Sequence, residues 1–101
     1  MYVVHNRIEV PPEGAEAFEK AFTESMRRTL GGVSGLCRSL LLRPGSPSQP
    51  YISTMEFDSQ DDFRAWLQSD SFRAAHSDVQ APGMQAPSAI ESFDLVTDVI
   101  G

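Results

Sequence analysis

The chain of 101 residues carries a formal net charge of −6, with 41% hydrophobic and 22% charged residues and one cysteine. This length predicts a single domain over residues 1–101, and the negative charge argues against nucleic acid and anionic membrane surfaces as partners. No apolar run approaches the roughly 18–20 residues that a membrane span needs. The single Cys37 excludes an intramolecular disulfide and fits a reducing compartment, so we expect a cytoplasmic protein.

The first predicted element is a β-strand over residues 2–10, where apolar and polar residues alternate. On one face of this strand a single polar residue, Asn6, stands among four apolar ones: Tyr2, Val4, Ile8 and Val10. A buried carboxamide without hydrogen-bond partners costs about 1–3 kcal/mol. The presence of Asn6 on this face therefore requires an explanation.

The next predicted element is an amphipathic helix that begins after Pro11-Pro12 and ends at Gly31-Gly32. Its apolar stripe recurs at spacings of three or four: Ala15, Phe18, Phe22, Met26 and Thr29. Two strands are then expected over residues 35–45 and 50–57, joined by a turn-rich link. Residues 40–42 are three consecutive leucines, which place apolar side chains on both faces of the first of these strands. One face can meet the helices, and the other indicates contact with a second copy of the chain.

The second half of the chain predicts a split helix followed by a last strand. Ser59 and Ser69 are expected to cap two short helices, whose stripes are Phe63, Trp66 and Leu67 in the first and Phe72, Ala75, His76 and Val79 in the second. A loop is expected over residues 81–88 and a strand over residues 90–100. The order β-α-β-β-α-β predicts a ferredoxin-like α+β fold with helices on one face of an antiparallel sheet. Paired through the other sheet face, two copies would form a homodimer that encloses a barrel-like core.

Three residues interrupt or decorate the apolar faces: Asn6, Trp66 and His76. Each has an ordinary structural explanation, as a backbone-bonding Asn, a core Trp and a half-exposed His. A pocket between the sheet and the helices would receive all three, and imidazole is a common ligand of haem iron. The absence of a Gly-rich phosphate loop, a CxxC pair and a Gly-x-Ser-x-Gly turn argues against phosphate-loop chemistry and nucleophilic hydrolysis.

Two segments carry a family resemblance, "NRIEV" on the first strand and "FRAWLQSDSFRAAH" across the split helix. Within the β-α-β-β-α-β order they resemble the antibiotic biosynthesis monooxygenase (ABM) family of dimeric α+β barrels, and most closely its bacterial Isd-type haem-degrading monooxygenases. The resemblance implies an enzyme that binds one haem per subunit of a homodimer, as both substrate and cofactor. It implies that His76 is the proximal ligand of the haem iron, that Asn6 hydrogen-bonds the oxygen bound there, and that Trp66 presses on the porphyrin. With O₂ and an external electron donor such as a reductase, the ring would open and release iron.

Two alternatives to a haem-degrading monooxygenase remain. The chain can be a cofactor-independent ABM-type monooxygenase of polycyclic aromatic or phenolic substrates, with the same Asn and Trp as substrate contacts. It can also be a dimer that binds haem without degrading it. The loop over residues 81–88 departs from the family pattern, which leaves Arg7, Arg64 and Arg73 as candidates to meet the haem propionates.

Overall fold

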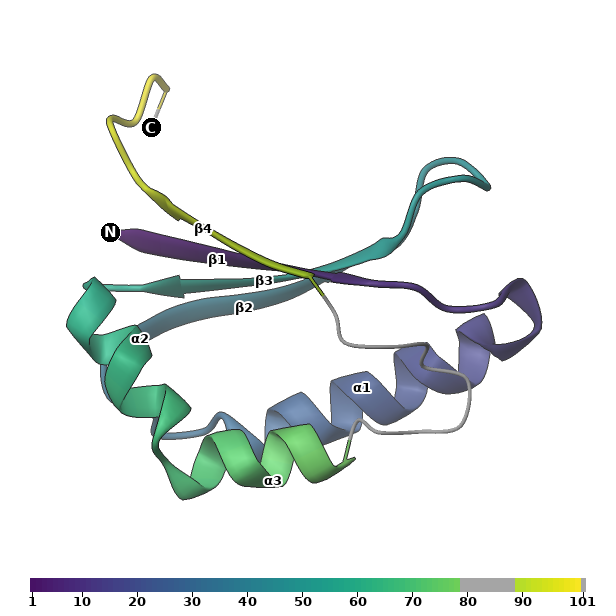
Figure 1. The fold of residues 1–101 in the computed structure, drawn as a ribbon, viewed down its shortest axis with the longest axis horizontal. Helices are drawn as coiled ribbons and strands as arrows, with labels where there is room; N and C mark the ends of the chain where they lie inside the picture. Colours follow the sequence, from purple (N-terminus) through teal and green to yellow (C-terminus); the bar gives the residue numbers. More distant parts are fainter. Residues whose placement is uncertain (79–88, 101) are drawn as a thin grey trace.

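The computed structural model describes the backbone of residues 1–78 and 89–100 and the side chains of residues 1–75 and 90–100. The described elements are β1 (Tyr2–Ile8), the 3₁₀ turn η1 (Pro12–Gly14), α1 (Ala15–Thr29), β2 (Leu36–Leu42), β3 (Tyr51–Phe57), α2 (Gln60–Leu67), α3 (Asp70–Asp78) and β4 (Ala89–Asp94). The strands form one antiparallel sheet in the order β2-β3-β1-β4, and the helices lie on one of its faces (Figure 1). The predicted ferredoxin-like α+β fold with a split second helix is confirmed. The predicted loop over residues 81–88 lies outside the described residues, within which no helix is long and apolar enough to cross a membrane.

The side of the sheet that faces the helices carries the core. Burial alternates along β1, where Tyr2, Val4 and Ile8 are buried, and along β3, where Phe57 is 0% exposed. This alternation confirms the parity predicted for the first strand, because successive side chains of a strand point to opposite faces. Asn6 therefore lies on this helix-facing side. We call the opposite side, against which no helix lies in the described part of the chain, the open face.

The first helix begins and ends close to where the sequence predicts. Pro12 opens η1, which leads directly into α1, since proline has no N–H to donate and suits a helix start. Phe18 and Phe22 bury the apolar stripe in one cluster of the core. The helix is capped at Leu30, and Gly32 then turns the chain with a φ of 79°, a conformation that other residues rarely adopt.

Two serines cap two separate helix starts in the second half of the chain. Ser59 Oγ accepts a hydrogen bond from the backbone N–H of Asp62 at 3.2 Å and caps α2. Ser69 Oγ accepts one from the N–H of Phe72 at 3.2 Å and caps α3. The same Ser69 hydroxyl donates to the carbonyl of Trp66 at 2.6 Å, which satisfies one of the last carbonyls of α2. The two caps predicted from the sequence are confirmed.

A chain of hydrogen bonds ties the split helix to α1. The indole N–H of Trp66 donates to Ser71 Oγ at 3.1 Å, and the hydroxyl of Ser71 donates to the backbone carbonyl of Thr29 at 2.5 Å. Thr29 is the last residue of α1, where carbonyl groups have no partner within the helix. The Ser71 hydroxyl supplies that partner, so the start of α3 is fixed against the end of α1.

The last strand is shorter than predicted. The sequence predicts a strand over residues 90–100, whereas β4 spans Ala89–Asp94. β4 ends opposite the beginning of β1, and one further bond runs from the N–H of Leu95 to the carbonyl of Met1 at 2.9 Å. Residues 96–100 are not paired with β1 in the structure, so these residues do not extend the ladder.

One polar cluster joins α1 to the strands β2 and β3. Arg43 contacts the carboxylate of Glu19 twice, from Nε at 2.8 Å and from Nη2 at 2.7 Å, and the hydroxyl of Tyr51 donates to Glu19 Oε2 at 2.5 Å. The hydrogen bond from Arg43, and after it the one from Tyr51, lowers the pKa of Glu19 to about 2. The ring of Tyr51 is buried edge-on against Phe18, with ring centroids 5.0 Å apart, so the cluster borders the core.

Replacing Glu19 with Gln should remove part of the acid sensitivity of the fold. The pKa of folded Glu19, about 2, lies below its ordinary value of 4.5, so its charge stabilises the fold fully above pH 4.5 and progressively less as the pH falls to 2. Urea unfolding of the wild type and of Glu19→Gln, at pH 7 and in steps from pH 4.5 to about 2, measures this contribution. The difference in unfolding free energy should shrink across that window. A difference that is the same at every pH would contradict the assignment.

Replacing Ser71 with Ala should destabilise the junction of α2 and α3. The substitution leaves the buried indole N–H of Trp66 and the carbonyl of Thr29 without their partner, at a cost of about 1–3 kcal/mol. Urea unfolding followed by the fluorescence of the single tryptophan measures the loss. Ser48→Ala, on an exposed loop, is the control and should stay within about 0.5 kcal/mol of the wild type. Equal losses in the two variants would show that the Ser71 bonds contribute nothing.

Candidate functional site

The structure places Asn6 in the middle of the helix-facing side of the sheet. In the strand register Asn6 lies opposite Ser53 of β3 on one side and Ile90 of β4 on the other. Its carboxamide oxygen Oδ1 is buried and has no hydrogen-bond partner among the described residues. A buried acceptor without a partner costs about 1–3 kcal/mol, so this oxygen does not stabilise the described fold. A bound molecule is the simplest partner for the carboxamide.

The two neighbours of Asn6 differ in how far they are covered. Ser53 is 6% exposed, whereas Ile90 is 57% exposed although it shares the helix-facing side. Within the described part of the chain, the helices thus cover β3 and leave this part of β4 open. A polar group beside an uncovered apolar side chain is typical of the wall of a site for a mostly apolar ligand. The sequence carries no signal for Ser53, whose place beside Asn6 depends on the strand register.

Trp66 lies in the core at the end of the sheet where β1 begins. Its side chain is 9% exposed and packs against Phe57, Phe63 and Phe72, with ring centroids 6.0, 6.3 and 5.0 Å away. Its N–H is already bonded to Ser71. The interpretation of Trp66 as a core residue is confirmed, and its contact with a ligand remains a prediction.

The backbone of His76 lies in α3, whereas its side chain is outside the described part of the structure. α3 lies beside α1 in the helical layer, across from the sheet (Figure 1). The preceding residue, Ala75, is 5% exposed, so α3 is packed into the fold at this turn. Asn6 and His76 therefore come from opposite layers of the protein, the sheet and the helices, which is the arrangement that a pocket between the layers requires.

Two of the arginines considered for the acidic groups of a ligand are engaged elsewhere. Arg7 Nε lies 2.9 Å from Glu91 Oε1 on the open face, and strand parity turns it away from Asn6. Arg7 is therefore wrong as a candidate for the pocket. Arg73 Nη1 contacts Asp70 at 2.6 Å, one turn away on the exposed surface of α3. Exposed pairs of this kind contribute about 0–1 kcal/mol, so the Arg73 pair does little for the stability of the helix.

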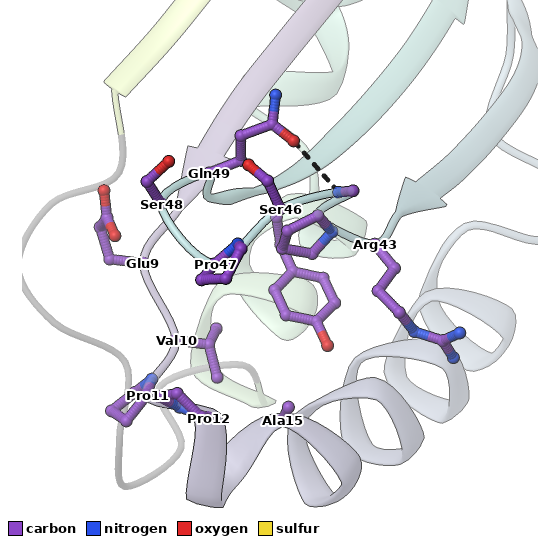
Figure 2. Close-up of a pocket in the computed structure, with 13 residues that line it drawn as sticks. Glu9, Val10, Pro11, Pro12, Ala15, Arg43, Ser46, Pro47, Ser48 and Gln49 are labelled. Atoms are coloured by element: carbon purple, nitrogen blue, oxygen red, sulfur yellow. Dashed lines mark hydrogen bonds between the residues drawn. The ribbon is translucent and has the colours of Figure 1, made fainter.

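The described residues also outline two cavities that are lined by neither Asn6 nor Trp66. The larger, of 680 Å³, lies between the connection from β1 to α1 and the loop from β2 to β3, where the N–H of Gly45 donates to Gln49 Oε1 at 3.1 Å (Figure 2). Its walls include four prolines: Pro11, Pro12, Pro44 and Pro47. The smaller cavity, of 350 Å³, lies between α1 and β2. Neither cavity was expected from the sequence.

Two comparisons by sequence give a consistent result. The family described as "Antibiotic biosynthesis monooxygenase" matches residues 1–78. The heme oxygenase (staphylobilin-producing) of Staphylococcus saprophyticus is 40% identical over 77 residues, which cover 75% of this chain and 73% of that protein. The family match leaves residues 79–101 aside.

Solved structures resemble the whole fold. The heme-degrader MhuD from Mycobacterium tuberculosis, with two hemes bound in its active site, is 27% identical, with a TM-score of 0.80 over 98% of this chain and 99% of that one. SnoaB from Streptomyces nogalater, a cofactor-independent oxygenase, is 21% identical, with a TM-score of 0.76 over 97% and 95% of the two chains, and shows the fold alone. Since the family match runs from β1 to the end of α3 and includes Asn6, Trp66 and His76, the chain belongs to the antibiotic biosynthesis monooxygenase family.

Proposed function

We propose that this protein is a haem-degrading monooxygenase that opens the porphyrin ring with O₂ and external electrons and releases iron. The observation that carries the proposal is the buried carboxamide oxygen of Asn6, which has no hydrogen-bond partner among the described residues and lies beside the exposed Ile90. An Asn with a purely structural role would find its partners within the fold. The names of two relatives, a heme oxygenase at 40% identity and a heme-degrader at 27%, support haem as the ligand in this proposal.

In this proposal three residues serve the haem from two layers of the fold. Asn6, on the sheet, would offer its carboxamide to the bound haem. His76, on α3, would hold the haem iron as its proximal ligand. Trp66, at the junction of α2 and α3, would press on the porphyrin. When bound, haem would supply the iron chemistry that uses O₂ and electrons from an external donor such as a reductase.

We also propose that the open face pairs with a second copy, so that the enzyme is a homodimer. Leu42 and Phe93 on this face are 47% and 48% exposed, respectively. Apolar side chains on a sheet face need a cover, and in the described part of the chain no helix supplies it. A second copy provides a cover of the same chemistry under two-fold symmetry.

We place the reaction in the cytoplasm. The only cysteine, Cys37, is exposed and forms no disulfide. Free exposed thiols are typical of proteins that work in a reducing compartment. The same compartment supplies the reduced cofactors on which an external electron donor depends.

Haemin titration of the purified protein tests the haem proposal. The Soret band should change saturably near one haem per chain, and ascorbate with O₂ should then bleach it and release iron. His76→Ala is expected to weaken haem binding at least about 10-fold, because it removes the ligand that holds the iron. Absorption spectra and an iron-chelator assay measure these outcomes.

The second histidine of the chain provides a matched control. His5 lies on the open face, edge-on to Phe93 with ring centroids 5.3 Å apart, so His5→Gln should bind and degrade haem as the wild type does. Weak, non-saturating binding shared by the wild type and both variants would remove iron from the proposal and leave an organic substrate for the site. A Soret band that survives ascorbate and O₂ would indicate a protein that binds haem without degrading it.

Replacing Asn6 with Leu should separate activity from stability. The substitution removes the unpartnered oxygen from the helix-facing side, so the unfolding free energy of the haem-free protein should stay unchanged or rise by about 1 kcal/mol. Haem should still bind, whereas the rate of its breakdown should fall about 100-fold with the loss of a hydrogen-bonding group at the reacting atoms. Urea unfolding and single-turnover bleaching measure the two effects.

Thr54→Val is the matched control for Asn6→Leu. Thr54 Oγ1 is likewise buried without a partner among the described residues, but it lies on the open face. The control should match or exceed the stability of the wild type and degrade haem at the wild-type rate. If Asn6→Leu instead lost stability by several kcal/mol, the side chain would have to bond within the fold, and its role toward a ligand would be wrong.

A further inference from the structure

A second polar side chain lies beside Asn6 on the helix-facing side of the sheet. Ser53 of β3 is directly opposite Asn6 in the strand register, and its side chain is buried. The other two residues in this row across the sheet are apolar, Leu41 on β2 and Ile90 on β4. Serine is not among the β-branched and aromatic residues that strands favour, and it is mostly found exposed. The presence of Ser53 at this position, like that of Asn6, therefore requires an explanation.

The strand register brings the two polar side chains within reach of each other. Residues directly opposite in an antiparallel pair have Cβ atoms about 4.5–5.5 Å apart, so a hydroxyl and a carboxamide can bridge that separation with one hydrogen bond. A second hydroxyl on this side of the sheet, that of Ser92 on β4, lies opposite Val4 and is exposed. It is diagonal to Asn6, and diagonal neighbours are about 7–8 Å apart. Of the two serines, Ser53 is the one placed to bond Asn6.

The carboxamide of Asn6 has two ends of opposite hydrogen-bonding character. The oxygen Oδ1 only accepts hydrogen bonds and the NH₂ group only donates them, and a half-turn about the last side-chain bond exchanges the two ends. Oδ1 is buried and has no partner among the described residues. A donor that held Oδ1 on the side of β3 would keep the NH₂ group directed toward a ligand. The hydroxyl of Ser53 can be this donor, because a serine O–H donates as well as accepts.

We propose that Ser53 is a positioning residue for Asn6: with a ligand in the site, its hydroxyl donates to Asn6 Oδ1 and holds the NH₂ group toward an acceptor atom of the ligand. This inference rests on the proposed haem site and assigns the orientation of Asn6 there to Ser53. The bond is not formed in the structure, where Oδ1 has no partner within the described part of the chain. Rotation of the two side chains is sufficient to form it.

A ligand and Ser53 would act on the same carboxamide from opposite ends. An acceptor atom bound to the NH₂ group and a hydroxyl bound to Oδ1 polarise the amide in the same direction, so each bond strengthens the other. A donor that is already oriented also stabilises charge on a reacting ligand without having to turn during the reaction. Without the Ser53 hydroxyl, Asn6 can turn its oxygen toward the ligand, where it would repel an acceptor atom.

Infrared spectroscopy of carbon monoxide bound to the ferrous haem protein tests the orientation of Asn6. A hydrogen-bond donor beside bound carbon monoxide lowers its stretching frequency, so the frequency reports whether the NH₂ group faces the ligand. Ser53→Ala should raise the frequency toward the value of Asn6→Leu and slow single-turnover haem breakdown about 10-fold. The haem dissociation constant should stay unchanged. Ser92→Ala is the matched control and should keep the wild-type frequency and rate.

Two further variants separate the hydroxyl of Ser53 from the size of its side chain. Threonine and valine have nearly the same shape and both suit a strand, but only threonine carries a hydroxyl. Ser53→Thr should therefore keep the wild-type frequency, and Ser53→Val should give that of Ser53→Ala. If the threonine and valine variants had the same frequency and the same rate, the hydrogen bond would have no part in the effect and the proposal would be overturned.

The double variant Asn6→Leu/Ser53→Ala shows whether Ser53 acts through Asn6. With Asn6 already replaced, Ser53→Ala should change neither the frequency nor the rate any further, because the partner of its hydroxyl is gone. An equal effect of Ser53→Ala in both backgrounds, or an unchanged frequency in Ser53→Ala alone, would overturn the positioning role and leave the haem site standing. A wild-type protein that bound no haem would overturn the proposed function and this inference together.

Discussion

The structure depends on one constraint: its sheet has two faces, and the described chain supplies helices for only one of them. On the helix-facing side Phe57 is 0% exposed and contacts the rings of Phe63 and Trp66. Burial of a side chain of this size contributes about 1.5–3 kcal/mol, which holds α2 on this face. The open face keeps half-exposed apolar side chains instead. The two faces therefore serve different functions. A ligand can bind between the sheet and the helices only on the helix-facing side, and a second copy can pack only against the open face.

Asn6 occupies a position on the covered side where an apolar residue would stabilise the fold. The Asn6 oxygen is buried and has no partner in the part of the chain that the structure describes, which costs about 1–3 kcal/mol. A domain of this size has a total stability of about 5–15 kcal/mol, so this cost is a substantial fraction of it. Departures of this kind from a consistent core are expected where a residue serves a ligand. Trp66 is the opposite case, since its ring is packed and its N–H is bonded. Any contact that it makes with a ligand is added to a structural role that it already has.

Periodicity along the sequence predicts the features that depend on nearby residues. Alternation along β1 is sufficient to place Asn6 on the helix-facing side, and Ser59 and Ser69 are sufficient to divide the second helix. Features that depend on pairing between distant segments cannot be predicted in this way. Ser53 reaches its place beside Asn6 only through the register of β1 with β3, and β4 stops where β1 begins. The side chain of His76 is outside the described residues, so its role is carried by the family resemblance alone.

The junction of α2 and α3 connects the core to the proposed iron ligand. Trp66 packs on Phe57 and donates to Ser71, which in turn donates to the end of α1. α3, which carries His76, starts at this junction, so these bonds set where its backbone lies along α1. A substitution of Trp66 therefore changes two things at once, the contact with a bound ring and the placement of the helix that carries the ligand. Ser71→Ala keeps the indole ring but removes both the partner of its N–H and the bond to the end of α1. Whatever share of a Trp66 defect it reproduces therefore belongs to the hydrogen bonds of this junction and not to the loss of the ring itself.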